Sequence, residues 1–562
     1  MTSKSSDNPS GHPIQASESS LGMADNDPGA GQEASFFSGH SLGPEGDDGT
    51  YITNNNGTPY PDYAHSKNVG GVPVISDTLL FEKWQTFNRS QTLGRVAHSA
   101  GSGAFGHFEC TKDMSSLTKA DLYNGKGKKT PVFVRFSAAF LGKESPDQGR
   151  SPRGFAIKHD TKDGIYDIVG LNWPVFFCRD PVQGPDVFLS QQRNPKNFLP
   201  DYNATFHFLA NVPESNHAAM MLFSNHGHPK GWRKMNGYGC HTFKWVNKEG
   251  QFVYVKYHFI CDQGSEQFTW GQAKGKCGED PDFSKRDLWE AIEKGEPVTW
   301  TAKVQVMKPE QADAAKLGFD PFDVTKIWPR EEFPMHEFGK LVLDRNPKDY
   351  HHEVEQAAFS PSSMVPGIEE SPDMLLHARM AFYRDAQLHR LGANFHRTQV
   401  NCPFESRFGC GGNTHYIFFN SSASKCRPDI AEVPYQVSDN IVSRQSHYHT
   451  EGTRREYDQA RVLYGRIMSD KARTDLHDNT AAVLKLVTDP DIQTRYLAQC
   501  YCVNPEYAKA IYCLLPEPAF DFGGVEDIAE DAPSFGKERK FMPFGENHRL
   551  VGNPATIPTY QM

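Results

Sequence analysis

Residues 371–392 read SPDMLLHARMAFYRDAQLHRLG, a pattern that predicts one long helix. Ser371 is expected to cap its N-terminus, Pro372 suits the first helical position, and Gly392 ends it. Once the helix is defined, the spacing of its polar side chains shows which of them lie on the same face.

Arg379, Tyr383 and Arg390 share one stripe of this helix. At about 100° per residue, positions i, i+4 and i+11 fall within about 40° of one another. A guanidinium one turn away favours the phenolate form of a tyrosine, and a phenolate is a hard anionic ligand suited to ferric haem iron. Arg390 could pair with a haem propionate. The alternative is a solvated helix face with an incidental tyrosine.

Residues 95–106, RVAHSAGSGAFG, contain a GxGxxG match at Gly101, Gly103 and Gly106. A dinucleotide-binding loop must follow a strand and open a helix, whereas residues 105–111 (FGHFECT) are strand-like. We therefore reject a Rossmann interpretation. His98, in the same segment, would by itself more often be structural than catalytic.

Acidic residues outnumber basic ones by 69 to 59 in the 562 residues, and no block of Lys and Arg breaks this balance, which argues against nucleic-acid binding. The eleven cysteines lack a zinc or disulfide spacing, as expected in a reducing compartment. The sequence has no secretory h-region, no apolar run of the ~18 residues that a membrane span needs, and no SKL-type C-terminal tripeptide. We expect a cytoplasmic protein without membrane contact.

Composition divides the chain into four regions. Residues 1–75 are rich in Ser, Gly, Asp and Asn and predict a disordered or extended arm. Residues 76–440 contain strand-like runs that suggest an antiparallel β core, residues 441–518 follow a helical pattern, and residues 519–562 form a Gly/Pro-rich tail. This order predicts an α+β fold. Strands are expected at 130–137, 154–158 and 251–260, and helices at 213–235, 286–295, 454–468, 471–487, 491–503 and 506–515.

Further segments occur in a fixed order along the chain. They are RxxH at 95–98, FVRFS at 133–137, PRGFAIK at 152–158, PVFFCRD at 174–180, GYGCHTFK at 237–244, DVTKIWP at 323–329, GKLVL at 339–343, and the helix with its RxxxY and HRLG motifs. In this order they resemble the haem catalases of the small-subunit type, over roughly residues 60–515. The resemblance implies the catalase fold, an antiparallel β-barrel core with a wrapping arm and a C-terminal helical region. It also implies a homo-oligomer, a tetramer or a dimer.

The resemblance further implies haem b as the cofactor and assigns roles around it. Tyr383 matches the iron ligand, and Arg379 matches its guanidinium partner. His98 matches the distal histidine that moves a peroxide proton between the two oxygens, with Ser137 as its hydrogen-bond partner. The other haem-binding positions of the family match Arg95, Arg135, Phe177 and Arg390.

The distal side departs from the family. Where the family reads GNNTP, with the first Asn as the catalytic amide, residues 170–174 read GLNWP, so Leu171 occupies the catalytic position. Asn172 is its neighbour, and adjacent residues of a strand face opposite ways. Asn172 is therefore the candidate catalytic amide only if the backbone shifts.

The residues of the peroxide channel depart as well. Ala97, Ala139, Gly184 and Val187 replace bulkier residues of the family, and Ser151 replaces an aspartate. These substitutions would enlarge the channel and make it less polar, which favours a larger organic substrate, as in natural-product oxidation. The alternative is that the substitutions accumulated under relaxed selection and have no functional consequence.

The leading hypothesis is a haem oxidoreductase of the catalase/peroxidase type that uses peroxide or another reduced oxygen species to oxidise a small organic substrate. An authentic catalase that disproportionates hydrogen peroxide is the second hypothesis, and a non-catalytic haem-binding or sensor protein is the third. NADPH binding stays open, because His241 and Lys244 fit that site of the family whereas His226 and Arg330 do not.

Overall fold

The computed structural model describes residues 54–56, 67–74, 77–90, 92–140, 142–296, 298–401 and 454–531. The chain divides into two compact units, Met1–Ser90 and Gln91–Met562. The expectations for the wrapping segment after residue 401, and for most of the N-terminal arm, lie outside the described residues.

The first unit contains a two-stranded hairpin and one helix. β1 (Asn68–Val69) pairs with β2 (Val72–Pro73), and α1 (Thr78–Asn88) is capped by the carboxylate of Asp77. None of the residues of α1 is buried. The first unit ends at Ser90 and includes α1.

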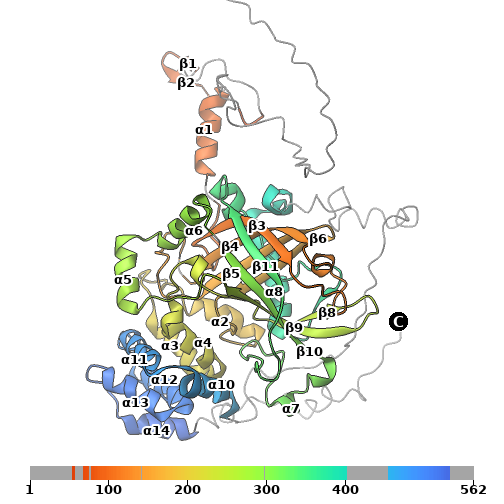
Figure 1. Ribbon diagram of the computed structural model, residues 1–562. Coiled ribbons are helices and arrows are strands. Elements are labelled where there is room, and N and C mark those ends of the chain that lie inside the picture. The colour runs from red at the N-terminus through yellow and green to blue at the C-terminus, as the bar shows by residue number, and fades with distance from the viewer. Residues whose placement is uncertain are drawn as a thin grey trace, which may run out of the picture. The chain divides into compact units, whose positions relative to one another are not determined.

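The second unit is built on an antiparallel sheet. Its described strands are β3 (Gly101–Cys110), β4 (Lys129–Ala138), β5 (Arg153–Thr161), β6 (Gly164–Leu171), β7 (Gly237–Tyr238), β8 (Phe243–Val246), β9 (Phe252–Cys261), β10 (Thr299–Met307), β11 (His336–Arg345) and β12 (Ile368–Glu370). They follow the order β10-β11-β3-β4-β5-β6-β7-β9, and β10 also pairs with β9, so these strands close into a barrel (Figure 1). β8 and β12 extend the sheet beside β9. The predicted α+β fold with a barrel core is confirmed. β4 and β5 contain two of the predicted strands, and β9 matches the third shifted by one residue.

The side chains of β4 point alternately into the barrel and away from it. Val132, Val134 and Phe136 point into the barrel core, where apolar side chains from all the main strands meet. Arg135 and Ser137 alternate with them and therefore lie on the outer face of the wall. Both are buried, at 3% exposure each, so another element must cover this face.

Helices pack outside the barrel. They are α2 (Gly184–Leu189), α3 (Tyr202–Asn211), α4 (Asn216–Phe223), α5 (Trp270–Glu279), α6 (Phe283–Glu293), α7 (Ala314–Leu317) and α8 (Met374–Leu391). The helix predicted at 213–235 is only the short α4 followed by 3₁₀ turns, because Gly227, Pro229 and Gly231 interrupt it. The helix predicted at 286–295 corresponds to the C-terminal part of α6, which ends two residues earlier, at Glu293. None of the described helices is both long and apolar enough to cross a membrane.

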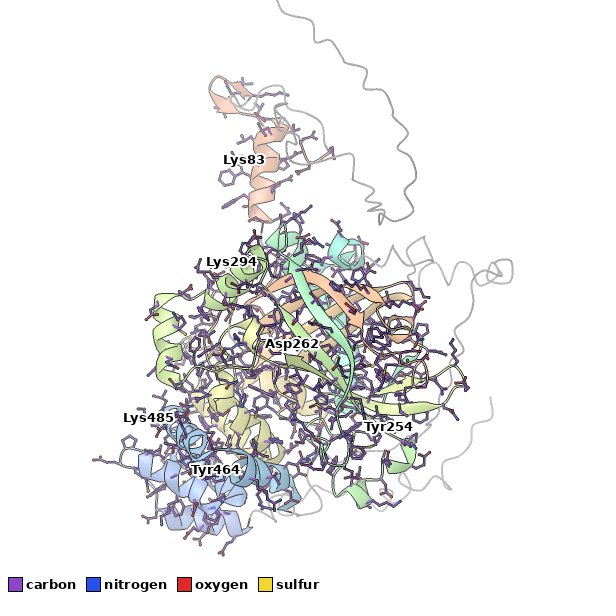
Figure 2. All side chains as sticks on the ribbon, in the orientation of Figure 1. Lys83, Tyr254, Asp262, Lys294, Tyr464 and Lys485 are labelled. Carbon is purple, nitrogen blue, oxygen red and sulfur yellow. The ribbon has the colours of Figure 1, made fainter. Side chains whose placement is uncertain are left out.

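The C-terminal helical region is confirmed and extends further than predicted. It contains α10 (Asp458–Val462), α11 (Asp470–Leu484), α12 (Pro490–Val503), α13 (Pro505–Leu514) and α14 (Phe522–Asp531). These helices share one apolar core with α3 and α4, to which Tyr464, labelled in Figure 2, contributes. The tail predicted from residue 519 is wrong as far as α14, because Val525 and Ala529 of that helix are buried in this core.

Candidate active site

Helix α8 begins at a different cap from the predicted one. The carboxylate of Asp373 accepts a hydrogen bond from the Leu376 amide at 3.1 Å and is the N-cap. The Ser371 hydroxyl donates to the carbonyl of Thr242 at 2.6 Å and accepts from the Asp373 amide at 3.2 Å, so it contacts the chain before the helix and not its first turn. The predicted cap at Ser371 is therefore wrong, whereas the predicted end at Gly392 is confirmed.

Tyr383 is joined to a chain of polar groups through Arg379. Arg379 Nη2 donates to the Tyr383 phenol oxygen at 2.7 Å, and Nη1 donates to His241 Nε2 at 2.7 Å. His241 Nδ1 lies 2.6 Å from a carboxylate oxygen of Asp373. Because a guanidinium can only donate, Nε2 must carry the lone pair and Nδ1 the proton. His241 is thus a neutral link that holds Arg379 against the phenol, and burial lowers its pKa.

The position of His241 corrects one expectation. His241 is 1% exposed behind Arg379 and Asp373, so it is not available to a dinucleotide. Lys244, the other residue expected at that site, is also buried, with its ammonium 5.2 Å from the ring of Phe252. Sequence reasoning missed the proximal role of His241, and its only signal was the GYGCHTFK motif.

Three arginines gather beside this network. Arg95 donates to the carbonyls of Glu355 and Ala357 at 2.9 and 2.7 Å, and Arg390 donates to the same two at 2.6 and 3.1 Å. Arg135 donates to the carbonyls of His98 and Ser99, at 2.8 and 3.0 Å. The predicted haem-binding residues Arg95, Arg135 and Arg390 are therefore brought together.

These guanidinium groups repel one another. Burial and the charges of Arg135 and Arg390 lower the pKa of Arg95. Burial and the charge of Arg135 lower the pKa of Arg390 to about 10. Within the described part of the chain none of the three donates to a carboxylate, and Arg135 Nε is buried without a hydrogen-bond partner. Such a cluster is suited to an anionic ligand with more than one carboxylate.

His98 lies close to the same cluster in a strained conformation. Its φ of 63° is in the left-handed region, which a residue other than glycine occupies only when its surroundings hold it there. Its Nδ1 lies 2.9 Å from the hydroxyl of Ser137, as predicted. A Cβ atom at Gly154 would collide with that hydroxyl and with the imidazole, so glycine is required there. Burial, with the charges of Arg135, Arg379 and Arg95, lowers the pKa of His98 to about 3 and keeps it neutral.

Leu171 lies on the face of the wall that carries this pair. Ser137 pairs with Gly154 across β4 and β5, and Gly154 pairs with Leu171 across β5 and β6. Residues opposite one another in a sheet project to the same side. Leu171 is 9% exposed and packs in an apolar cluster with Tyr238, Cys240, Val324 and Leu375.

Asn172, by contrast, does not reach His98. Its Oδ1 accepts from the Arg153 amide at 2.8 Å, and its Nδ2 donates to the His226 carbonyl at 3.2 Å. Both ends of the amide are engaged on the opposite side of the strand, and no backbone shift redirects it. The expectation that Asn172 supplies the distal catalytic amide is therefore corrected.

Ser151 and Phe177, two further residues singled out in the sequence, are both buried in the structure. The Ser151 hydroxyl is buried and accepts from the amides of Ala139 and Phe140 at 3.0 and 3.1 Å. Phe177 is 1% exposed, with its ring centroid 6.0 Å from that of Phe140. Ser151 thus fixes the loop after β4 and carries no charge.

The donor set fits haem. A phenol bonded to a guanidinium suits ferric iron, and unpaired arginines suit the two propionates. A neutral imidazole beside a hydroxyl suits the oxidant side. No group of three or more His, Cys, Asp or Glu in the described residues is arranged to hold a metal ion directly.

Comparisons with known proteins agree with this site. The family model described as Catalase matches residues 53–426, and the one described as Catalase-related immune-responsive matches residues 450–515. A catalase of Methanosarcina barkeri is 40% identical over 475 residues, which are 82% of this chain and 93% of that protein. A catalase of Streptomyces coelicolor is 40% identical over 479 residues, or 82% and 97%.

Solved structures give the same result. Catalase A from Saccharomyces cerevisiae superposes with a TM-score of 0.76 at 35% identity, and covers 83% of this chain and 98% of its own. A fungal catalase also gives a TM-score of 0.76, at 34% identity, with 83% and 97% covered. From its fold, its donor set and these relatives, the chain belongs to the catalase family of haem oxidoreductases.

Proposed function

We propose that this protein decomposes hydrogen peroxide to water and oxygen at a haem b whose iron is bound by Tyr383. The observation that supports it best is the 2.7 Å contact between Arg379 and the phenol oxygen of Tyr383, backed by His241 and Asp373. The relatives described above all carry the name catalase.

The proximal residues position the ligand. Arg379 donates to the Tyr383 phenol oxygen and would stabilise the phenolate that ferric iron binds. Neutral His241 accepts from Arg379 and so fixes the orientation of the guanidinium, while Asp373 fixes the tautomer of His241. Arg95, Arg135 and Arg390 would bind the propionates. A bound haem supplies the ferric iron at which the O–O bond of peroxide is broken.

The distal residues move the proton. With Nδ1–H donated to Ser137, Nε2 of His98 carries a lone pair that takes a proton from one peroxide oxygen and delivers it to the other. The pKa of His98 is lowered to about 3, so the imidazole is neutral at physiological pH. Its Nε2 lone pair is therefore available to accept that proton.

Leu171 limits this reaction. It offers no hydrogen bond on the face where His98 and Ser137 lie, so peroxide is oriented by the histidine alone. We therefore expect a slower turnover than in a catalase with an amide there. Oxygen release from purified, haem-loaded protein tests the proposal, and a holoprotein that releases no oxygen from peroxide would contradict it.

Oxidation of a small organic substrate is the second candidate. It is favoured by the apolar surroundings of Leu171 and by the small side chain of Ala139, although the compared proteins lend it no support. Peroxide-dependent consumption of apolar phenols or unsaturated fatty acids, with little oxygen release, would favour it over peroxide decomposition.

Three lesser expectations belong to the same proposal. We expect a homo-oligomer, a tetramer or a dimer, which sedimentation would measure, and a location in the cytoplasm. NADPH binding remains a prediction, now without His241, and fluorescence titration of the holoprotein with NADPH would test it.

A further inference from the structure

His241, which fixes the orientation of Arg379, lies at the end of a strained turn. The amide of His241 donates to the carbonyl of Gly239 at 2.7 Å, so residues 239–241 form a three-residue turn. Cys240, at its centre, has a φ of 60°. This is the rare and strained form of such a turn, and a residue other than glycine keeps it only when its surroundings hold it there.

The turn determines where the imidazole of His241 lies. It connects the end of β7 with the start of β8. Beyond it, His241 Nε2 lies 2.7 Å from Arg379 Nη1, and Nδ1 lies 2.6 Å from the Asp373 carboxylate. Both contacts are short hydrogen bonds, so a change in the backbone at Cys240 would move the imidazole away from one or both partners. The geometry of the turn therefore sets the contact that orients Arg379.

A buried ammonium group contacts this turn. Lys256, on β9, is 4% exposed, and its Nζ donates to the carbonyl of Cys240 at 2.9 Å. Within the described residues this is the only hydrogen bond to that carbonyl, and Cys240 is itself buried. A buried carbonyl without a donor destabilises the fold, so the turn should rearrange if the ammonium is lost.

The thiol of Cys240 restrains the turn less strongly. Its Sγ lies 3.4 Å from the carbonyl of Trp173 and 3.5 Å from that of Tyr238. A thiol has one proton and is a weak donor, so it makes at most one weak hydrogen bond at a time. The bond from Lys256 is charge-assisted and is therefore the stronger of the two restraints.

Packing alone does not explain a lysine at this position. The ring of Trp328 lies beside it, with its centroid 5.7 Å from Nζ, and a methionine would pack against that ring without carrying a charge. Burial lowers the pKa of Lys256, whereas the charge of Asp373 acts to raise it. A buried charge that opposes folding calls for an explanation, and the hydrogen bond to the Cys240 carbonyl supplies one.

The charge of Lys256 also acts on His241 directly. Burial lowers the pKa of His241, and the charge of Asp373 acts to raise it. The charges of Arg379 and Lys256 oppose that effect of Asp373. A neutral His241 keeps the lone pair on Nε2 that accepts from Arg379, so the ammonium and the turn favour the same contact.

We propose that Lys256 is a positioning residue of the peroxide reaction, whose ammonium holds the strained turn at Cys240 and thereby keeps His241 against Arg379. This inference rests on the proposed function, in which Arg379 supports the Tyr383 phenolate. Lys256 acts through the backbone of Cys240 and not on the reacting atoms. Its loss should therefore alter the environment of the iron ligand before it alters the fold.

The test is the variant Lys256→Met in haem-loaded protein. Methionine keeps the packing against Trp328 but offers no donor to the Cys240 carbonyl. We expect the ferric haem spectrum to shift in the same direction as in His241→Ala, because both changes leave Arg379 less well oriented. Oxygen release per bound haem should fall by about tenfold, the order of effect of a group behind a metal ligand. A crystal structure of the variant should show His241 Nε2 further than 2.7 Å from Arg379 Nη1.

A double variant separates positioning from general destabilisation. If Lys256 acts through His241, then Lys256→Met should leave the spectrum of a His241→Ala protein unchanged. Lys326→Met is the matched control, because Lys326 is also buried and donates to Glu456 at 2.8 Å, and Glu456 keeps Arg179 as a partner. Its spectrum should equal that of the unaltered protein. Additive shifts in the double variant, or an unaltered spectrum in Lys256→Met, would overturn the proposal.

A second variant addresses the same turn if Lys256→Met does not fold. Cys240→Val keeps the lysine, but a β-branched residue tolerates a φ of 60° poorly, so the turn should relax and the spectrum should shift as in His241→Ala. Cys500→Val is its control, because Cys500 is buried in α12 of the C-terminal helical region, and it should leave the spectrum unchanged. An unaltered spectrum in Cys240→Val would contradict the proposal as well.

The outcome is separable from that of the proposed function. Unaltered holoprotein that lacks the spectrum of a phenolate-bound ferric haem, or that releases no oxygen from peroxide, would count against the proposed function. If the unaltered protein shows both, and Lys256→Met and Cys240→Val leave its spectrum as it is, only the positioning role of Lys256 is wrong.

Discussion

His241 and Asp373 are joined by a 2.6 Å hydrogen bond between Nδ1 and a carboxylate oxygen, on the side of Arg379 that faces away from Tyr383. Asp373 also caps α8. Asparagine caps helices as well as aspartate does, so Asp373→Asn removes the charge but keeps the cap. We expect about tenfold lower peroxide decomposition and a shifted ferric haem spectrum, the order of effect of a group behind a metal ligand.

The control for this variant is Asp489→Asn. Asp489 caps α12 through its side chain, outside the candidate site, and the variant should change neither the spectrum nor the activity. If Asp373→Asn leaves the haem spectrum unaltered, the chain from Asp373 through His241 to the phenol is only structural.

Tyr383→Phe removes the proposed iron ligand. The Tyr383 ring is half-buried, and within the described residues its hydroxyl is hydrogen-bonded only to Arg379, so the fold should survive its loss. We expect a large fall in bound haem and in the ferric spectrum per molecule of protein. Tyr501→Phe, in the C-terminal helical region, should leave both unchanged. A fully loaded Tyr383→Phe protein with an unaltered spectrum would refute the ligand assignment.

Leu171→Asn places an amide on the face that carries Ser137 and His98. We expect peroxide decomposition to rise by about tenfold or more, which is less than the roughly hundredfold that one fully positioned hydrogen-bond donor contributes. The amide also enters an apolar cluster, which should lower the free energy of unfolding by about 1–3 kcal/mol. Leu375→Asn is the control within that cluster, and it should lose stability without gaining activity. No gain from Leu171→Asn would show that another step limits turnover.

The sequence predicted the parts of this site that depend on local pattern. The stripe of Arg379, Tyr383 and Arg390 follows from helical periodicity, and the facing of Leu171 follows from strand alternation. The cap of α8 did not follow, because Ser371 and Asp373 are both good caps. In the structure Ser371 contacts Thr242, which lies 129 residues away, and the Asp373 amide, so the helix begins two residues later than expected.

Long-range contacts explain the other differences. His241 is brought behind Arg379 by the loop between β7 and β8, a contact across 138 residues that no local pattern contains. α14 was missed because Gly523 and Gly524 lower its helix propensity. Burial of Val525 and Ala529 in the helical core outweighs that preference.

Asn172→Ala separates a structural from a catalytic role for that amide. The side chain accepts from the Arg153 amide and donates to the His226 carbonyl, and both groups would lose their partner. We expect the free energy of unfolding to fall by about 1–3 kcal/mol, measured by denaturant titration. Asn172→Asp keeps the acceptor and should cost less. A fall in oxygen release of a hundredfold per bound haem, with stability intact, would instead support a catalytic role.

Buried neutral histidines should make the fold sensitive to mild acid. Burial lowers the pKa of His98 and His258 to about 3 and that of His159 and His217 to about 4. In the unfolded chain histidine binds a proton near pH 6.5. The unfolded state therefore takes up more protons below that pH, and stability that is complete above pH 6.5 is lost as the pH falls towards 4.

Each such histidine contributes a loss of up to about 1.4 kcal/mol per pH unit below 6.5. Denaturant unfolding at pH 7 and pH 5 measures the sum in a range where most carboxylates stay ionised. His217→Phe should make the loss smaller, because phenylalanine has no proton to bind in the unfolded state. His352→Phe is the control, since His352 is exposed in the folded protein, and the loss should stay as in the unaltered chain. Equal stability of the unaltered protein at the two pH values would mean that these side chains are charged in the folded state, and His98 could then not act as the proton acceptor.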